Sequence, residues 1–208
     1  MMLNADSLLF PLVAVDVGNS RVKLGLFDAP PEQAFPVPSR SITLGSDLNW
    51  QNLAAWLDEG SSPRSWLIAS VQRATAARLF ELLAAHASCT ARLLTAGDLP
   101  LHVDVPEPER VGIDRLVNAV AANHLRAAGR GAIVIDLGSA ITIDAVSADG
   151  VFLGGAILPG IGMSARALHE FTDLLPLSEM TELRDAPEAL GKNTTAALRS
   201  GLFWGAVG

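Results

Sequence analysis

The chain has 208 residues, of which 50% are hydrophobic and 18% are charged, and its net charge is -7. A chain of this length and composition buries one sizeable core or two small ones, so disorder is expected only at the ends. The acidic balance excludes a broad nucleic-acid footprint, because phosphate backbones are bound by clustered Lys and Arg. Cys89 is the single cysteine, which excludes an intramolecular disulfide and a multi-cysteine metal site.

The N-terminal segment and the apolar runs indicate the compartment. The first ten residues contain no Lys or Arg and no long apolar stretch before a small-residue cleavage site, so they do not read as a signal peptide. No apolar run reaches the roughly 18 residues that a membrane-spanning helix needs. We expect a soluble cytoplasmic protein with neither a membrane partner nor a nucleic-acid partner.

The first half of the chain predicts a hairpin followed by alternating strands and helices. An apolar run at 11–15 ends in Asp-Val-Gly-Asn-Ser, and the alternation over 22–26 predicts a second strand. The segment 29–39 carries four prolines and predicts a loop. The elements expected after it are a short strand at 41–44, a helix at 50–57, a buried strand at 66–71 and a helix at 74–87.

The second half repeats the opening pattern. Gly112 precedes a run of helical spacing at 113–128, and a strand is expected at 132–135. That strand leads into Asp136-Leu137-Gly138-Ser139-Ala140, so a D-x-G-x-[SA] core recurs 120 positions after the first. The repeat predicts two related α/β domains, 1–110 and 111–208. The remaining expected elements are a strand at 151–157 and helices at 160–171 and 193–204.

The first Asp-Gly turn has the composition of a phosphate site. In Asp16-Val17-Gly18-Asn19-Ser20, glycine lets the backbone turn sharply and direct successive N–H groups at an anion. The Asp16 carboxylate suits Mg²⁺, which arrives with a nucleotide triphosphate and is held through one or two carboxylates. Lys23, on the polar side of the next strand, is placed to reach a phosphate. The alternative interpretation is an ordinary hairpin turn followed by a solvated lysine.

The second turn, at 136–142, adds two hydroxyl groups to the same pattern. Ser139 and Thr142 follow the glycine, and two such turns facing one cleft would hold the two ends of a polyphosphate. The alternative is that both are simply strand residues, as β-branched threonine often is.

Gly112-Ile113-Asp114-Arg115 opens a predicted helix, at the end that attracts negative charge. The planar fork of Arg115 suits a carboxylate on a substrate, because it can bond both oxygens at once. Asp114 could accept the proton of an attacking alcohol, as a carboxylate does in phosphoryl transfer by kinases. The alternative is stabilisation of the helix end, which favours Asp in any first turn.

Two further segments are rich in glycine or in capping residues. The run 154–160 contains three glycines, which indicates a close approach of a ligand or of backbone, or a tight corner between a strand and a helix. The run 191–195, Gly-Lys-Asn-Thr-Thr, precedes the last predicted helix, so Asn193 or Thr194 is also explained as an N-cap.

Taken together and in order, five segments resemble the type III pantothenate kinases, including the branch called Bvg accessory factor. The resemblance covers nearly the whole chain and is carried by 14–28, 109–122, 134–146, 154–168 and 191–201. It implies the fold class of acetate kinase, sugar kinases, Hsp70 and actin, with two ribonuclease-H-like domains around a nucleotide cleft. It also implies ATP-dependent phosphorylation of pantothenate to 4′-phosphopantothenate, the first step of coenzyme A biosynthesis.

The same resemblance implies the nucleotide and cation contacts. Asp136 matches the ligand of a monovalent cation, normally potassium, with ammonium as the alternative. Ser139 matches an ATP contact at which threonine is more usual. Asp16 would lie near Mg²⁺, within a phosphate-binding segment that consists of Asp16, Val17, Gly18, Asn19, Ser20, Arg21, Val22 and Lys23.

On the substrate side, the resemblance implies that Asp114 is the catalytic base. Pantothenate would be held by Gly112, Ile113, Asp114 and Arg115. Thr194 matches a pantothenate contact that comes from the opposite subunit of a homodimer, and Val105 stands where the family often has a tyrosine. The family normally continues beyond the position of Gly208, so we expect the second domain to lack its C-terminal end; the alternative is that something else completes this domain.

Two other functions compete with this interpretation. A non-catalytic regulator is one, since the Bvg accessory branch takes its name from a proposed role in transcription. Another enzyme of the same fold, such as a sugar kinase or an exopolyphosphatase, is the second; it would share the Asp-Gly turns but not Gly-Ile-Asp-Arg followed by Gly-Lys-Asn-Thr.

Overall fold

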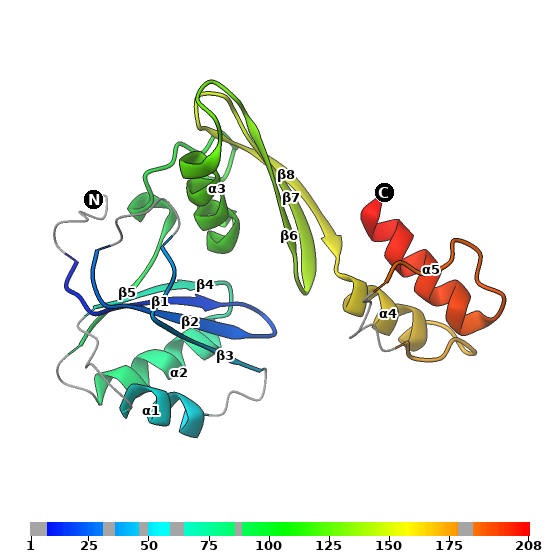
Figure 1. Cartoon of the computed structure of the whole chain (residues 1–208), viewed down its shortest axis with the longest axis horizontal. Helices are drawn as coiled ribbons and strands as arrows, with labels where there is room; N and C mark the ends of the chain where they lie inside the picture. Colours follow the sequence, from blue (N-terminus) through cyan, green and yellow to red (C-terminus); the bar gives the residue numbers. More distant parts are fainter. Residues whose placement is uncertain (1–7, 31–35, 46–49, 59–64, 86–88, 179–184) are drawn as a thin grey trace. The chain divides into compact units, whose positions relative to one another are not determined.

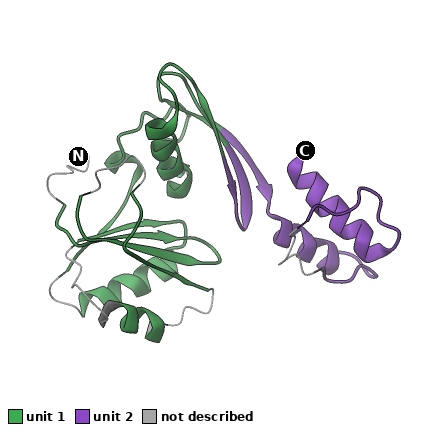
Figure 2. Cartoon of the chain, in the orientation of Figure 1, with its two compact units in different colours: residues 1–134, 144–154 green, residues 135–143, 155–208 purple. Residues whose placement is uncertain are grey.

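A computed structural model describes residues 8–30, 36–45, 50–58, 65–85, 89–178 and 185–208 of the chain. The chain divides into two compact units (Figure 2). The first unit contains residues 1–134 and 144–154, and the second contains 135–143 and 155–208. These boundaries differ from the expected domains 1–110 and 111–208, which remain a prediction.

The first unit is built on a five-stranded mixed sheet, in the order β3-β2-β1-β4-β5 (Figure 1). Its strands are β1 (Leu12–Val17), β2 (Val22–Phe27), β3 (Arg40–Leu44), β4 (Ser65–Ser70) and β5 (Thr90–Leu93). β1 pairs antiparallel with β2, and β2 with β3, whereas β4 is parallel to both β1 and β5. The carboxyl ends of β1 and β4 therefore lie at the same edge of the sheet.

Two helices cover one side of this sheet, α1 (Trp50–Asp58) and α2 (Arg73–Ala84) (Figure 1). Alternate residues of β1 and β2 are buried in a core with apolar side chains of both helices: Val13, Val15, Val17, Val22, Leu24, Leu53, Leu79 and Leu83. Side chains alternate across a strand, so Asp16 and Lys23 lie on the opposite side of the sheet from this core.

A second apolar cluster lies beneath α3 (Ile113–Leu125). Leu116 and Ala119 of the helix pack there against Val146 and Phe152. These two belong to a three-stranded sheet of order β6-β7-β8, formed by β6 (Ala132–Leu137), β7 (Ala140–Val146) and β8 (Phe152–Pro159). The short helices η2 (Ala96–Asp98) and η3 (Pro108–Arg110) precede α3.

Asp98 anchors η2 to the neighbouring strand. Its side chain is buried, and it accepts hydrogen bonds from the main-chain N–H of Thr95 at 2.8 Å and from the Thr95 hydroxyl at 2.7 Å. It also pairs with Arg92 of β5. The Thr95 hydroxyl, the Thr95 amide and then Arg92 together hold the pKa of Asp98 below its ordinary value.

The second unit contains the helices α4 (Ile161–Glu170) and α5 (Thr194–Val207). The segment before α5 folds back onto that helix. The Ser200 hydroxyl donates to the carbonyl of Ala189 at 2.7 Å, and Trp204 Nε1 donates to the carbonyl of Pro187 at 3.1 Å. Among the described residues, no helix is long and apolar enough to cross a membrane.

The strands and helices predicted within the described residues are all present, with ends shifted by a few residues. The predicted loop at 29–39 and the end of the helix predicted at 74–87 fall partly outside the described residues. β5 is an additional strand that the sequence pattern did not predict.

Candidate functional site

The predicted phosphate turn joins β1 to β2. The N–H of Gly18 donates to the carbonyl of Arg21 at 2.9 Å, which closes a tight turn. Asn19, Ser20 and Arg21 are exposed on it. A Cβ on Gly18 would lie 3.2 Å from the same Arg21 carbonyl, so the turn closes tightly around a residue without a side chain. Its exposed tip is therefore open to a ligand.

Asp16 and Lys23 are opposite each other in the β1–β2 register. Lys23 Nζ lies 3.4 Å from Asp16 Oδ2, and the side chains are 63% and 46% exposed, respectively. Val17 and Val22, which flank the turn, are buried in the core. Of the predicted phosphate-binding segment, these two valines can therefore offer a ligand only main-chain groups.

The start of α3 places the carboxylate of Asp114 against the helix end. The N–H of Arg115 donates to Asp114 Oδ1 at 2.8 Å and to the carbonyl of Gly112 at 3.1 Å. A Cβ on Gly112 would lie 2.5 Å from Asp114 Oδ1, so any other residue at 112 would displace this carboxylate from its present position. Ile113 is buried and anchors the first turn.

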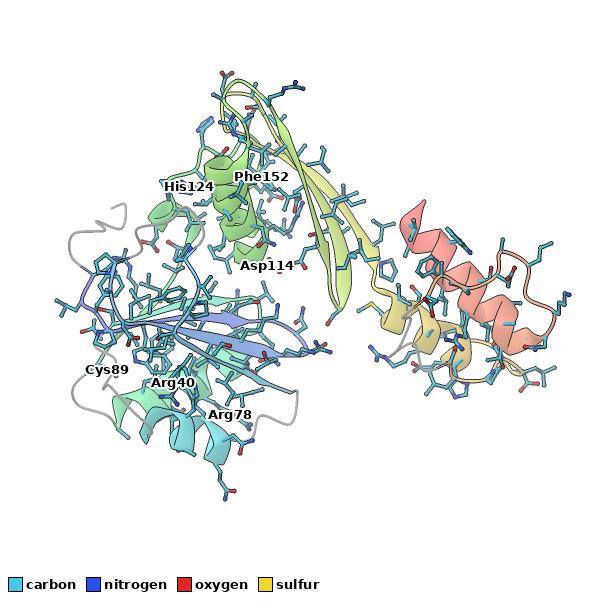
Figure 3. All side chains as sticks on the ribbon, in the orientation of Figure 1. Arg40, Arg78, Cys89, Asp114, His124 and Phe152 are labelled. Atoms are coloured by element: carbon cyan, nitrogen blue, oxygen red, sulfur yellow. The ribbon has the colours of Figure 1, made fainter. Side chains whose placement is uncertain are left out.

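Val71 connects the phosphate turn to the start of α3. Its N–H donates to the carbonyl of Val17 at 3.0 Å, at the point where β1 leads into the turn. A Cβ built on Gly112 would lie 3.8 Å from Val71 Cγ1. Figure 3 shows Asp114 at the end of α3 that faces the five-stranded sheet. The structure thus brings Asp114 to the edge where β1 and β4 end.

Arg115 is engaged with a buried carboxylate of the protein itself. Its Nε lies 3.0 and 3.1 Å from the two oxygens of Asp144, and its Nη2 bonds Asp144 Oδ1. The side chains of Arg115 and Asp144 are 14% and 1% exposed. The guanidinium also lies over the ring of Phe152, with Cζ 5.5 Å from the ring centroid. One edge of the Arg115 fork is therefore filled before any substrate binds.

Asp144 is the site residue that the sequence interpretation missed. The signal in the sequence was an aspartate within a strand pattern. Such a charged residue is buried only when it is paired, so a buried Asp144 requires a partner. The loose alternation over 140–146 did not indicate which face of that strand is buried. The structure shows that Asp144 and Val146 are both buried, whereas Ile143 is exposed.

Val105, predicted to line the substrate pocket, packs against the cluster beneath α3. A Cβ on Gly154 would lie 3.6 Å from Val105 Cγ1, and Gly154 has a φ of 100°, which L side chains rarely adopt. This glycine is explained by the local backbone of β8.

The second predicted turn lies between β6 and β7. The N–H of Gly138 donates to the carbonyl of Ala140 at 2.9 Å, and the N–H of Gly160 donates to the carbonyl of Ser139 at 3.0 Å. A Cβ on Gly160 would overlap the carbonyl oxygens of Gly138 and Ser139. The start of α4 thus lies against the turn through a close backbone approach, and the Asp136 side chain is exposed at the end of β6.

Thr194 is the first residue of α5 and is exposed. Asn193 is the N-cap, since its Oδ1 accepts from the N–H of Ala196 at 2.9 Å. A Cβ on Gly191 would overlap the main chain of Ala196 and Ala197, so the loop approaches the helix closely at this point. The capping role falls to Asn193, which leaves the Thr194 side chain without a part in the cap.

The predicted site residues are divided between the units. Asp136, Ser139 and Thr194 lie in the second unit, and all the others lie in the first. Within the described ranges, no cluster of three or more His, Cys, Asp or Glu side chains is arranged to hold a metal ion. A cation at Asp16 or Asp136 would therefore need further ligands from main chain, water or nucleotide.

Known proteins of one family are similar to this chain over most of its length. A family model described as type III pantothenate kinase matches residues 12–208. A protein named type III pantothenate kinase from Rhodopirellula baltica is 45% identical over 145 residues, which are 68% of this chain and 52% of that protein. Proteins of the same name from Paramagnetospirillum magneticum and Thermus thermophilus are each 36% identical, over 95% and 93% of this chain and 76% and 77% of their own length. The chain thus spans about half the length of the first of these relatives and about three quarters of the other two.

Proposed function

Because the chain belongs to the type III pantothenate kinase family, we propose that it transfers the γ-phosphoryl group of ATP to the primary hydroxyl of pantothenate. The products are ADP and 4′-phosphopantothenate, the first intermediate of coenzyme A synthesis. The observation that carries the proposal is the position of Val71, whose N–H bonds the Val17 carbonyl and whose Cγ1 would lie 3.8 Å from a Cβ built on Gly112. This position supports a site in which the phosphate turn and the Asp114 carboxylate act together at the same edge of the five-stranded sheet.

The strand order supports our proposal that the chain contains ribonuclease-H-like domains. A sheet in the order β3-β2-β1-β4-β5, with three antiparallel strands followed by two parallel ones, has the arrangement of a ribonuclease-H-like domain. Residues 1–110 contain this sheet, and 111–208 would begin a second domain of the same kind, with β6, β7 and β8 as its first three strands. The nucleotide would bind in the cleft between these domains.

The phosphates of ATP would be bound by main-chain N–H groups of the β1–β2 turn and by polar side chains on it. Gly18, Asn19 and Ser20 supply the tight, exposed turn, and Arg21 and Lys23 supply positive charge. Ser139, in the second turn, would provide a further contact.

The carboxylates fit the cations that this reaction uses. Asp16 is half exposed beside the phosphate turn, which suits Mg²⁺, an ion that is bound through one or two carboxylates together with water and substrate phosphates. Asp136 is exposed at the end of β6, next to the β6–β7 turn, and its carboxylate would suit potassium or ammonium. These cations would supply charge that offsets the negative phosphates.

Asp114 would act as the general base. Its Oδ1 accepts from the N–H of Arg115, so the helix end holds the carboxylate in a fixed orientation. During transfer, the substrate hydroxyl oxygen bonds to the γ-phosphorus, the bond from that phosphorus to the ADP oxygen breaks, and the hydroxyl proton passes to Asp114. Positioning contributes most to such a reaction, because its transition state is loose.

Pantothenate would be held at the start of α3 by residues 112–115, with Val105 nearby. Thr194 would reach the substrate from the partner subunit of a homodimer. Its exposed position and the capping role of its neighbour Asn193 leave its hydroxyl available for that contact.

The experiment is ADP release by the purified protein with pantothenate, with a panel of sugars and with no acceptor. We expect pantothenate alone to raise the rate above the blank. A rate with pantothenate equal to the blank would reject the kinase and favour the regulatory alternative, and a response to a sugar would favour another kinase of this fold.

A further inference from the structure

Asp144 is a carboxylate buried in β7, and a buried charge is costly unless it is paired. Its partner is Arg115 of α3, which uses Nε and Nη2 to bond the Asp144 oxygens. The two residues are 29 positions apart in the chain. The pair therefore connects the helix that carries Asp114 to the strand beneath it.

Phe152 adds a second constraint on the same guanidinium. Its ring, fully buried on β8, lies under Arg115 with 5.5 Å between Cζ and the ring centroid. The ring limits the space on one side of the guanidinium, and the bonds to Asp144 restrict its rotation. Figure 3 shows Phe152 beside α3. Arg115 is thus oriented by two neighbouring strands.

The oriented fork retains unused donors. A guanidinium has five N–H groups, and the bonds to Asp144 use those of Nε and one of Nη2. Within the described ranges, no acceptor bonds Nη1. Nη1 and the second N–H of Nη2 form another planar edge, which matches a carboxylate. The side chain is 14% exposed, so it is not completely closed off by the protein.

The position of Arg115 also argues for a role beyond folding. It is the third residue of α3, where the helix end disfavours a positive charge. The helix end taken by itself would favour an uncharged or acidic residue there. An anionic ligand would offset the cost of a cation at this position and would use the donors that Asp144 leaves unoccupied.

We infer that Asp144 is a positioning residue, which holds Arg115 so that its Nη1 and Nη2 edge receives the carboxylate of pantothenate. The inference rests on the proposed function, because it takes pantothenate as the substrate. Pantothenate carries its carboxylate at the end opposite the phosphorylated hydroxyl. Asp144 does not touch the substrate and acts only through Arg115.

Two effects of removing Asp144 on ligand binding oppose each other. Coulomb attraction alone predicts tighter binding of a carboxylate ligand, because Arg115 would lose its neutralising partner. Loss of orientation predicts weaker binding, because the fork would no longer face the ligand. We expect the loss of orientation to dominate, so that Asp144→Asn binds the carboxylate more weakly.

The test compares pantothenate with its analogue in which the carboxylate is replaced by a primary alcohol. KM and kcat are measured for both compounds with the wild type, Asp144→Asn and the control Asp149→Asn, an exposed aspartate in the β7–β8 turn. We expect the preference for pantothenate to fall about tenfold in Asp144→Asn, through KM, and to stay unchanged in the control. Equal weakening for both compounds, or a larger preference, would overturn the inference.

Arg115→Lys keeps the test valid if Asp144→Asn fails to fold. Lysine can still pair with Asp144 but offers no second planar edge, so the same loss of preference is expected in a folded protein. An Arg115→Lys variant that retains the preference for pantothenate over the alcohol would overturn the inference but not the proposed function. A wild-type protein that neither binds nor phosphorylates pantothenate would overturn the proposed function together with it.

Discussion

Asp16 of β1 and Lys23 of β2 face each other across the hairpin, with 3.4 Å between Oδ2 and Nζ. Both side chains are well exposed, and an exposed ion pair of this kind contributes about 0–1 kcal/mol to stability. The pair is therefore weak enough to open when phosphate competes for Lys23. Stability therefore does not account for its position beside the Gly18 turn, and we propose that ligand binding does.

Replacement of Lys23 by Gln tests this explanation. Hydrogen bonds to charged groups contribute about 1.5–3 kcal/mol, so the KM for ATP should rise roughly tenfold to a hundredfold. The melting temperature should stay close to that of the wild type. Arg78→Gln, at an exposed position on α2 (Figure 3), is the matched control and should change neither quantity. An unchanged KM for ATP in Lys23→Gln would remove the lysine from the nucleotide site.

The proposed role of Asp136 predicts that turnover depends on monovalent cations. If its carboxylate holds potassium or ammonium beside the second turn, turnover should be faster in either ion than in sodium at equal ionic strength. Asp136→Asn should lose most of that difference while the fold is kept, because the side chain is exposed. Equal wild-type turnover in sodium and potassium buffers would contradict the assignment.

The secondary structure was predictable where periodicity and turn residues agreed. The apolar alternation of β1 and β2, interrupted at Gly18, and the helical spacing from Ile113 both led to the observed elements. β5 was missed because Thr90–Leu93 is short and mostly exposed, and its place is set by parallel pairing with β4. Such a pairing joins residues that are distant in sequence and leaves little local pattern.

The candidate site was predictable as residue types but not as contacts. Asp114 at a helix start and Gly18 in a turn follow from local rules for helix ends and hairpins. The pairing of Arg115 with Asp144 does not, because it depends on which face of β7 packs beneath α3. Val71 likewise has no local signature for its bond to the Val17 carbonyl or for its position near Gly112.

Asp98 makes stability depend on pH. Its pKa is held below the ordinary value of 3.8, chiefly by the Thr95 hydroxyl, so its stabilisation is complete above that value and is lost as the pH falls through the lowered pKa. Asp98→Asn should lower the free energy of unfolding by about 1–3 kcal/mol at pH 7, and by progressively less below pH 4. Denaturant unfolding at pH 7 and pH 3 measures this. A difference from the wild type that is the same at both pH values would contradict the role of the charge.

Two glycines on either side of the start of α5 should respond oppositely to alanine. Gly191→Ala would place a methyl group against the main chain of Ala196 and Ala197, and should cost about 1–3 kcal/mol. Gly205 lies within the helix with no heavy atom within 4 Å of a built Cβ, so Gly205→Ala should stabilise by up to about 1 kcal/mol. Thermal unfolding distinguishes them, and similar melting temperatures for both variants would contradict the close approach at Gly191.

The most direct test of the proposed activity is the pantothenate-dependent formation of 4′-phosphopantothenate, measured by mass spectrometry for the wild type and for Asp114→Asn. A general base contributes roughly 10² to 10⁴ in rate, so the variant should bind ATP and form product at least about a hundredfold more slowly. Loss of a helix-end carboxylate alone would cost only about 0.3–1 kcal/mol of stability and leave turnover unchanged. We expect product from the wild type and almost none from the variant. No phosphopantothenate from the wild type, or equal turnover by a folded Asp114→Asn, would contradict the account.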